Sequence, residues 1–161
     1  MNPFLLVKKG FFLLKNKKEM YTQNIDIRWA DLDPNFHVLH SKYYDFCAFA
    51  RTAFLYENNI TAAVMAQLAI GPILFKEECI FKKEIRFGDK VTVLVELSGA
   101  SQNFARWQMK HQILVGENVL AAQVSVQGAW MDVIKRKLTI PPQSIVEVFE
   151  KAPRSDDFKF L

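Results

Sequence analysis

Residues 27–46 read IRWADLDPNFHVLHSKYYDF, and this stretch concentrates the reactive side chains of the chain. It holds two aspartates, Asp31 and Asp33, and two of the three histidines in the sequence, His37 and His40. A strand-like alternation precedes it, and a helix-like spacing follows it. Because loops between rigid elements commonly position catalytic groups, we interpret the stretch as a candidate active site.

The pattern around this stretch predicts one strand, one loop and one long helix. Residues 21–30 alternate well enough to be predicted as a strand. Residues 31–40 contain proline and asparagine and are predicted to form the loop. Ser41 is a credible N-cap for a helix that continues to about Asn58. The stripe expected along this helix consists of Tyr43, Phe46, Cys47, Ala50, Phe54, Tyr56 and Glu57.

Beyond Gly71 the pattern becomes that of a β-sheet, and residues 60–70 before it favour a short helix. Glycine-containing turns at residues 88–89 and 116–118 indicate hairpins. One helix packed on an antiparallel sheet is an α+β layout, here followed by a short helix at 143–150 and a polar tail. The predicted strands are residues 73–87, 90–98, 105–115, 119–132 and 137–140.

The charge of the chain is concentrated at its N-terminal end. Residues 1–20 carry five lysines against Glu19 alone, which accounts for the whole formal charge of +4. The rest of the sequence is electrically balanced, which excludes the basic footprint of a nucleic-acid-binding protein. We predict a basic and apolar extension at residues 1–19 and a single domain at residues 20–161, a usual size for one domain.

The extension has no apolar run long enough to span a bilayer and no signal-peptide pattern. We expect it to be flexible or packed at an edge, with weak membrane contact as the alternative. Cys47 and Cys79 match neither a disulfide framework nor a metal site, which favours free thiols in a reducing, cytoplasmic location. Fourteen phenylalanines are compatible with a large core, an apolar ligand channel or a subunit interface.

Several motifs follow one another in a recognisable order. The most specific is Arg28-Trp-x-Asp31-x-Asp33, followed after six residues by His40-x-x-Tyr43. This order resembles that of the hotdog-fold thioesterases, namely the 4-hydroxybenzoyl-CoA thioesterase group and the Tol-Pal-associated acyl-CoA thioesterases. The resemblance implies an antiparallel sheet of five to six strands wrapped around one long central helix. The other matching motifs are Ala50-Arg51-Thr52-x-x-Leu55, Phe87-Gly88-Asp89 and Ser144-Ile145-Val146.

The resemblance also implies a reaction, the hydrolysis of an acyl-CoA or acyl carrier protein thioester to acid and thiol. In that family the second aspartate of the motif is the nucleophile or general base, and Asp33 holds that position. A catalytic histidine seven residues later corresponds to His40. Backbone N–H groups around His40 and Ser41 would polarise the thioester carbonyl, as helix N-termini do. The implied reaction needs no metal and no cofactor except the coenzyme A of the substrate.

Substrate contacts are expected from four residues. One of them, Phe36, departs from the family pattern, and another, Arg106, is a candidate substitute for a basic cluster that is missing here. Relatives usually carry glycine where Phe36 stands, and a ring there would narrow the loop or shape the acyl pocket. Many relatives carry asparagine at the position that Leu39 holds here. Residues 99–103 lack the basic cluster that some relatives use for CoA phosphates, for which Arg106 is a candidate replacement or simply part of a solvated strand face. The expected substrate-binding residues are Ser41, Tyr43, Phe36 and Arg106.

Other interpretations of these residues remain open. Asp31 can serve as a turn former, His37 as a structural loop residue and Tyr43 as helix packing. A hotdog hydratase is disfavoured because its pattern has four residues between aspartate and histidine, a spacing absent here. A non-catalytic acyl-binding protein is the remaining alternative. In each case the exposed sheet edges favour self-association as a homodimer or homotetramer.

Overall fold

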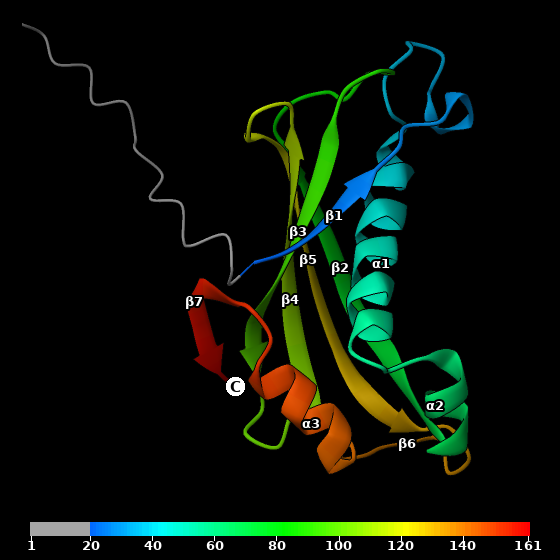
Figure 1. Ribbon diagram of the computed structural model, residues 1–161, viewed down its shortest axis with the longest axis vertical. Helices are drawn as coiled ribbons and strands as arrows, with labels where there is room; N and C mark the ends of the chain where they lie inside the picture. Colours follow the sequence, from blue (N-terminus) through cyan, green and yellow to red (C-terminus); the bar gives the residue numbers. More distant parts are fainter. Residues whose placement is uncertain (1–19) are drawn as a thin grey trace, which may run out of the picture.

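The computed structural model describes residues 20–161, and the N-terminal extension predicted above lies outside them. A twisted sheet runs alongside one long helix, α1 (His40–Glu57), with the short helices α2 (Ala62–Gln67) and α3 (Gln143–Glu150) near one end (Figure 1). This confirms the α+β class. The strands are β1 (Tyr21–Ile25), β2 (Ile70–Phe81), β3 (Val91–Ala100), β4 (Arg106–Val115), β5 (Val119–Asp132), β6 (Lys137–Leu138) and β7 (Arg154–Phe160).

Among the described residues the sheet has seven strands, with the main path β1-β3-β4-β5-β2. These five strands are antiparallel, β6 pairs with β5, and β7 pairs with β3 in parallel. The expected antiparallel sheet of five to six strands is confirmed by β1 to β6, and β7 adds a seventh, parallel strand that was not expected. The C-terminal residues, predicted as a polar tail, form this seventh strand because an edge of β3 is open to them.

Two strands from opposite ends of the described chain occupy that edge of β3. β1 pairs with residues Val91–Val95, and β7 pairs with β3 between Leu97 and Ala100. The register shifts at this point, between Leu97 and Gly99. The edge of β3 is thus divided between two short strands.

The buried face of α1 packs on the sheet, mainly against β3 and also against β1 and β5. Five of the residues predicted as its stripe are buried, which confirms that part of the pattern. Tyr56 and Glu57 at its C-terminal end are exposed, so the stripe ends earlier than predicted. Cys47 is fully buried as a free thiol, and burial raises its pKa. The buried five are Tyr43, Phe46, Cys47, Ala50 and Phe54.

The start of α1 differs from the prediction by two residues. Leu39, not Ser41, is the N-cap, and it supplies no side-chain hydrogen bond to the helix. The backbone before it is already fixed, because Leu39 N donates to Asp31 O (2.8 Å) and Val38 N donates to Ile85 O (2.8 Å). Tertiary backbone pairing therefore sets the first helical residue, whatever side chain is available for capping.

β2 lies at the other edge of the main sheet and stops at Phe81, short of the predicted residue 87. It ends because Lys82 N and Lys83 N both donate to Ala121 O, which breaks the ladder. Four large apolar side chains of this strand are 45–54% exposed: Leu74, Phe75, Ile80 and Phe81. Within residues 20–161, no helix has the length and apolarity that crossing a membrane requires.

Candidate active site

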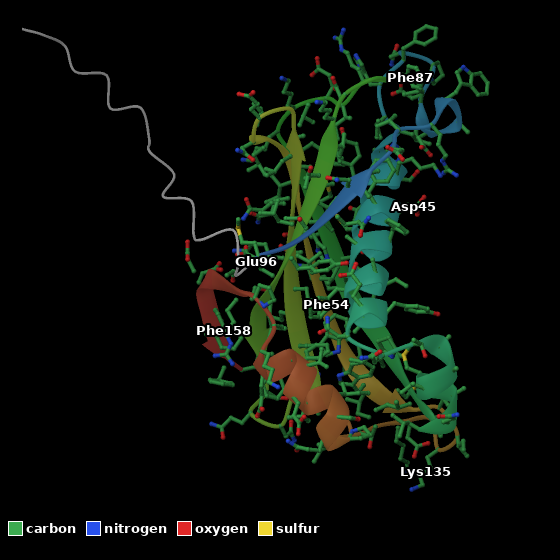
Figure 2. All side chains as sticks on the ribbon, in the orientation of Figure 1. Asp45, Phe54, Phe87, Glu96, Lys135 and Phe158 are labelled. Carbon is green, nitrogen blue, oxygen red and sulfur yellow. The ribbon has the colours of Figure 1, made fainter. Side chains whose placement is uncertain are left out.

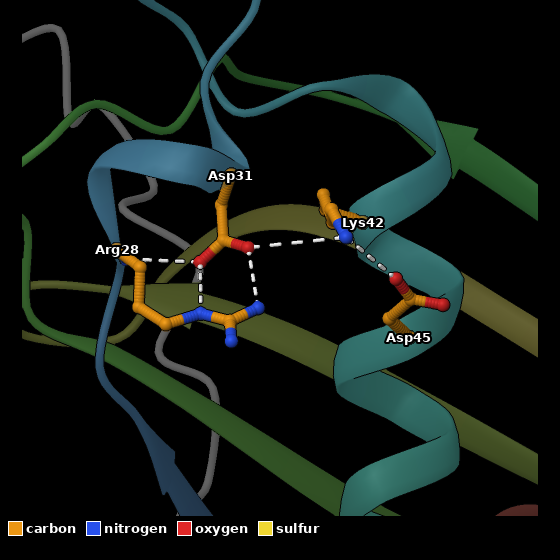
Figure 3. Close-up of polar contacts among 4 residues, drawn as sticks. All are labelled: Arg28, Asp31, Lys42 and Asp45. Carbon is orange, nitrogen blue, oxygen red and sulfur yellow. Dashed lines mark hydrogen bonds and ion pairs between the residues drawn. The ribbon is translucent and has the colours of Figure 1, made fainter.

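The loop that precedes α1 is anchored by Asp31, whose side chain is fully buried. Arg28 donates to it through Nη2 (2.9 Å to Oδ1) and Nε (3.2 Å to Oδ2), and the backbone N of Arg28 donates to Oδ2 (2.9 Å). Lys42 Nζ, from the first turn of α1, lies 4.0 Å from Oδ1 and also pairs with Asp45 (Figure 3). One carboxylate therefore ties the loop to the helix.

This environment keeps Asp31 ionised. The hydrogen bonds from the Arg28 side chain lower the pKa of Asp31, and the charges of Arg28 and Lys42 act in the same direction. Both carboxylate oxygens are occupied, so Asp31 has a structural position rather than an exposed reactive one. Sequence reasoning missed the partners Arg28 and Lys42; the i, i+3 spacing of Arg28 and Asp31 was the available signal.

Asp33 is only partly buried, and the loop holds its carboxylate through one oxygen. Oδ1 accepts hydrogen bonds from Asn35 N (2.9 Å) and His37 N (3.1 Å). The backbone closes around the same residue, since Asp33 N donates to His37 O (2.7 Å) and Phe36 N donates to Asp33 O (2.9 Å). Among the described residues no hydrogen bond ends on Oδ2. The side chain is therefore fixed in place and has one oxygen left for a ligand.

Phe36 occupies the tip of this loop with its ring in solvent. Its φ is +61°, and its side chain is 73% exposed. A backbone in this left-handed region is easiest for glycine, the residue that the resemblance to hotdog-fold thioesterases implies here. Trp29 (80% exposed) and Phe87 (65% exposed) also present rings to solvent in the flanking segments, and Phe87 marks this end of the molecule in Figure 2. The loop region is therefore rich in exposed aromatic surface.

The N-terminus of α1 presents unpaired backbone donors. His40 and Ser41, both exposed, are its first two residues, and within the described chain their N–H groups have no acceptor. The first turn of any helix leaves such groups free, and here the N-cap residue Leu39 has no polar side chain to satisfy them. They combine with the positive end of the helix dipole, which favours an anion or a developing negative charge.

Tyr43 lies in the same helical turn but is buried. Its side chain is 3% exposed and its ring contacts Phe81 edge-on, with centroids 5.0 Å apart. Burial raises the pKa of Tyr43, and the negative charge of Asp33 adds to that rise. The backbone bridge between Leu32 and Val38 holds the segment that carries Asp33 beside the residues that lead into α1.

Arg106 is not brought to this loop within one chain. It begins β4, opposite Ala129, and its guanidinium lies over the ring of Phe75 at 5.5 Å. The candidate loop instead follows β1, whose end pairs with Val91 at the far end of β3. Ten strand residues separate the two ends, which corresponds to roughly 30 Å. Lys135 marks the end opposite Phe87 in Figure 2.

Two hollows of the described chain do not include the candidate residues Asp33 and His40. One cavity of about 210 Å³ lies between α1 and the sheet, and a more open groove of about 520 Å³ lies where β1 ends and β3 begins. Neither is lined by Asp33 or His40. Within the described residues, no three His, Cys, Asp or Glu side chains are grouped to hold a metal ion.

Comparison with known proteins identifies the family. A family model described as the thioesterase-like superfamily matches residues 27–149. No curated protein is significantly similar to the chain in sequence.

Solved structures share the fold at low sequence identity. A hypothetical protein from Staphylococcus aureus, solved in complex with CoA, has a TM-score of 0.75 at 17% identity, covering 84% of this chain and 87% of that one. The 1,4-dihydroxy-2-naphthoyl-CoA thioesterase from Synechocystis has a TM-score of 0.73 at 18% identity, covering 81% and 95%. A DHNA-CoA thioesterase from S. aureus has a TM-score of 0.74 at 20% identity, covering 82% and 89%.

Proposed function

The chain belongs to the thioesterase-like superfamily, and we propose that it hydrolyses the thioester of an acyl-CoA to a free acid and a thiol. The observation that carries this proposal is the Asp33 carboxylate, fixed through Oδ1 near the uncapped start of α1. A thioester hydrolase needs a nucleophile or base next to donors for the oxyanion, and this loop supplies both kinds of group.

In the proposed reaction the thioester carbonyl oxygen accepts hydrogen bonds from the N–H groups of His40 and Ser41. The helix dipole stabilises the negative charge that develops on that oxygen. Asp33 Oδ2 either attacks the carbonyl carbon or takes a proton from the attacking water. The C–S bond then breaks, and His40 transfers a proton to the departing thiolate. Water supplies the second oxygen of the acid product.

Two observations support CoA as the carrier and an apolar acyl group. One of the similar solved structures was determined in complex with CoA, and two others are named as thioesterases of a CoA ester. The exposed rings of Phe36 and Trp29 flank the loop and offer an apolar surface for the acyl part. Phe36, Ser41 and Tyr43 remain the proposed contacts around the acyl group, Tyr43 from its buried position behind the loop.

A homodimer formed through β2 is part of the proposal. β2 is an edge strand whose side chains Leu74, Phe75, Ile80 and Phe81 are half exposed, and an edge of this kind favours pairing with another strand. Two copies related by a two-fold axis would pair β2 antiparallel, which reverses the ends of the molecule. Arg106 of one copy would then approach the Asp33 loop of the other and be available for the CoA phosphates.

The test is a panel of acyl-CoAs of varied acyl groups, with release of the free thiol as the readout. Asp33→Asn keeps the size of the side chain and its hydrogen-bond acceptor but removes the charge. We expect turnover to fall roughly 10²–10⁴-fold, the usual contribution of a general base. Asp26→Asn, at an exposed aspartate just after β1, is the matched control and should leave turnover unchanged.

Two outcomes would contradict the proposal. Undiminished turnover in Asp33→Asn, with the fold intact by circular dichroism, would rule out the assigned role of this carboxylate. Tight binding of acyl-CoAs without thiol release across the whole panel would instead indicate a non-catalytic acyl-binding protein.

A further inference from the structure

A second site is indicated by the cavity of about 210 Å³ between α1 and the sheet. It is reached from the C-terminal half of α1, where Ala48, Arg51, Thr52 and Leu55 line it. These residues are 8–15 positions beyond His40, which places them roughly 12–22 Å along the helix from the candidate active site. The sheet and α3 complete the lining with Pro72, Leu74, Trp107, Met109, Trp130 and Phe149.

Arg51 brings an incompletely paired positive charge to this cavity. Its side chain is 12% exposed, and its one ion pair within residues 20–161, Nη2 to Glu77 Oε1, is long at 3.4 Å. The other terminal nitrogen, Nη1, is buried and has no hydrogen-bond partner among the described residues. Burial lowers the pKa of Arg51, but a guanidinium remains charged at neutral pH. A buried, partly compensated cation favours an anion beside it.

Two indole groups add further donors without acceptors. Trp107 is 4% exposed and Trp130 is fully buried, and the Nε1–H of each lacks a hydrogen-bond partner within the described chain. Buried polar groups are nearly always hydrogen-bonded in native proteins. Three unsatisfied donors on residues that line one small cavity are therefore a strong departure from that rule. All three require an acceptor, and none of the other lining side chains is a carboxylate.

The neighbouring histidine does not add a competing charge. His111 is fully buried on β4, its Nδ1 lies 3.1 Å from Val124 O, and its Nε2 is unpartnered among the described residues. Burial, with the charge of Arg51 as a further cause, lowers the pKa of His111 to about 3, so the imidazole is neutral. Arg51 is therefore the positive charge that a ligand in this cavity would meet, and Glu77 lies on its other side.

We propose that this cavity binds a small carboxylic acid whose apolar body is about one ring in size. The carboxylate would accept hydrogen bonds from Arg51 Nη1 and from the indole N–H groups, and the body would contact Leu55, Met109 and Phe149. A cavity of about 150 Å³ is large enough for benzene, so about 210 Å³ accommodates a ring together with a carboxylate. The site is independent of the proposed hydrolysis, because neither Asp33 nor His40 lines it.

Benzoate is the probe, and the two buried tryptophans report its binding. Trp29→Phe removes the exposed third tryptophan, so that fluorescence comes from Trp107 and Trp130 alone. In this background we expect a saturable fluorescence change with benzoate. Benzyl alcohol has the same ring without the charge. It should bind at least roughly tenfold more weakly, which is the loss of affinity expected when a charge-assisted hydrogen bond is removed.

Arg51→Met tests the charge directly, with Arg136→Met as the matched control at an exposed arginine. Arg51→Met should weaken benzoate at least roughly tenfold without lowering the melting temperature of the free protein, because it removes an incompletely paired buried charge. Arg136→Met should leave binding unchanged. Ala48→Leu fills the cavity and should also abolish the saturable fluorescence change with benzoate. This variant is the alternative test if Arg51→Met fails to fold.

The proposal is overturned by any of three results. These are the absence of a saturable change with benzoate, equal affinity for benzyl alcohol and benzoate, and unchanged benzoate affinity in folded Arg51→Met. Because the measurement is binding and not turnover, a failure here is separate from a failure of the proposed hydrolase activity.

Discussion

Asp31 and Asp33 are separated by one residue yet have different surroundings. Asp31 is buried, and both of its oxygens accept hydrogen bonds from Arg28. Asp33 is partly exposed and is held through Oδ1 alone. A 3-10 turn ends at Asp31 and a second turn begins at Asp33, so the first carboxylate fastens the loop and the second is presented at the surface. At the residue scale, position in the loop decides the role of each aspartate.

Asp31→Asn is expected to destabilise the protein by roughly 2 kcal/mol, because it removes the charge of a fully buried carboxylate that accepts hydrogen bonds from Arg28 and faces Lys42. The measurement is the free energy of unfolding from urea titration. Asp45→Asn is the control, since Asp45 is 65% exposed in the same network and its loss should be nearly neutral. Equal effects of the two substitutions would contradict this account.

The stabilisation from Asp31 also predicts a pH dependence. The folded pKa of Asp31 is lowered, whereas an aspartate in the unfolded chain titrates near ~3.9. The contribution is therefore fully present above about pH 4 and is lost as the pH falls further through the folded pKa. We expect the difference in unfolding free energy between the parent protein and Asp31→Asn to shrink over that acid range. A difference that stays constant down to low pH would argue against the ion pair.

Sequence patterns located the candidate site but not its internal contacts. Asp33, His40 and the start of a helix follow from motif spacing, and they lie in one segment of the chain. The N-cap was misplaced at Ser41, because the backbone before α1 is fixed by hydrogen bonds from Leu39 to Asp31 and from Val38 to the distant Ile85, which no local pattern encodes. The cavity around Arg51 was missed for the same reason, since its donors come from three different elements.

At the scale of elements, the strand β7 shows how tertiary pairing overrides composition. Its sequence, RSDDFKF, has too many charges to be predicted as a strand. It forms because it pairs with the open end of β3 and because Lys110 Nζ contacts Asp157 Oδ2 at 2.6 Å. Hydrogen bonds from Lys110 and Ser155 lower the pKa of Asp157 to about 2. The elements β5 (Val119–Asp132) and α3 (Gln143–Glu150), which are held by strong local patterns, were predicted to the residue.

Deletion of residues 154–161 is expected to lower the melting temperature and to promote aggregation, because it unpairs the end of β3. Light scattering during a thermal melt measures both effects. Asp157→Asn is the milder comparison, since it weakens the Lys110 contact while keeping the strand, and its effect should be much smaller. A truncated protein that stays monodisperse and melts normally would show that β7 is dispensable.

At the scale of the whole molecule, the candidate loop and Arg106 lie at opposite ends of one chain. An antiparallel dimer through β2 would combine them across the two-fold axis, and it would also cover the exposed apolar side chains of that strand. The sequence predicted self-association from exposed edges in general. It did not identify β2, because the edge position of a strand depends on the order of the whole sheet.

Ile80→Lys is expected to prevent the proposed dimer from forming and to leave a monomer, because it places a charge on the exposed edge strand β2. Light scattering coupled to gel filtration gives the mass. Ile134→Lys is the control, since Ile134 is 77% exposed in the turn after β5 and its substitution should leave the mass unchanged.

Subunit mixing tests whether the two ends meet in one site. Asp33→Asn and Arg106→Met chains, each defective alone, should regain activity when they are co-expressed, because one site of the mixed dimer would then carry both native residues. Absence of recovery in mixed dimers would show that the proposed site does not join residues of two copies.

The divided edge of β3 has a consequence for how the protein is made. β1 is among the first described segments to leave the ribosome, whereas β7 is the last, and both complete the same strand. Contacts between such distant parts of a chain form slowly, because a large loop must close first. Until β7 has been synthesised, residues 97–100 of β3 have no neighbour on that side. We therefore expect folding of the chain to be slow and dependent on chaperones until β7 has paired with β3.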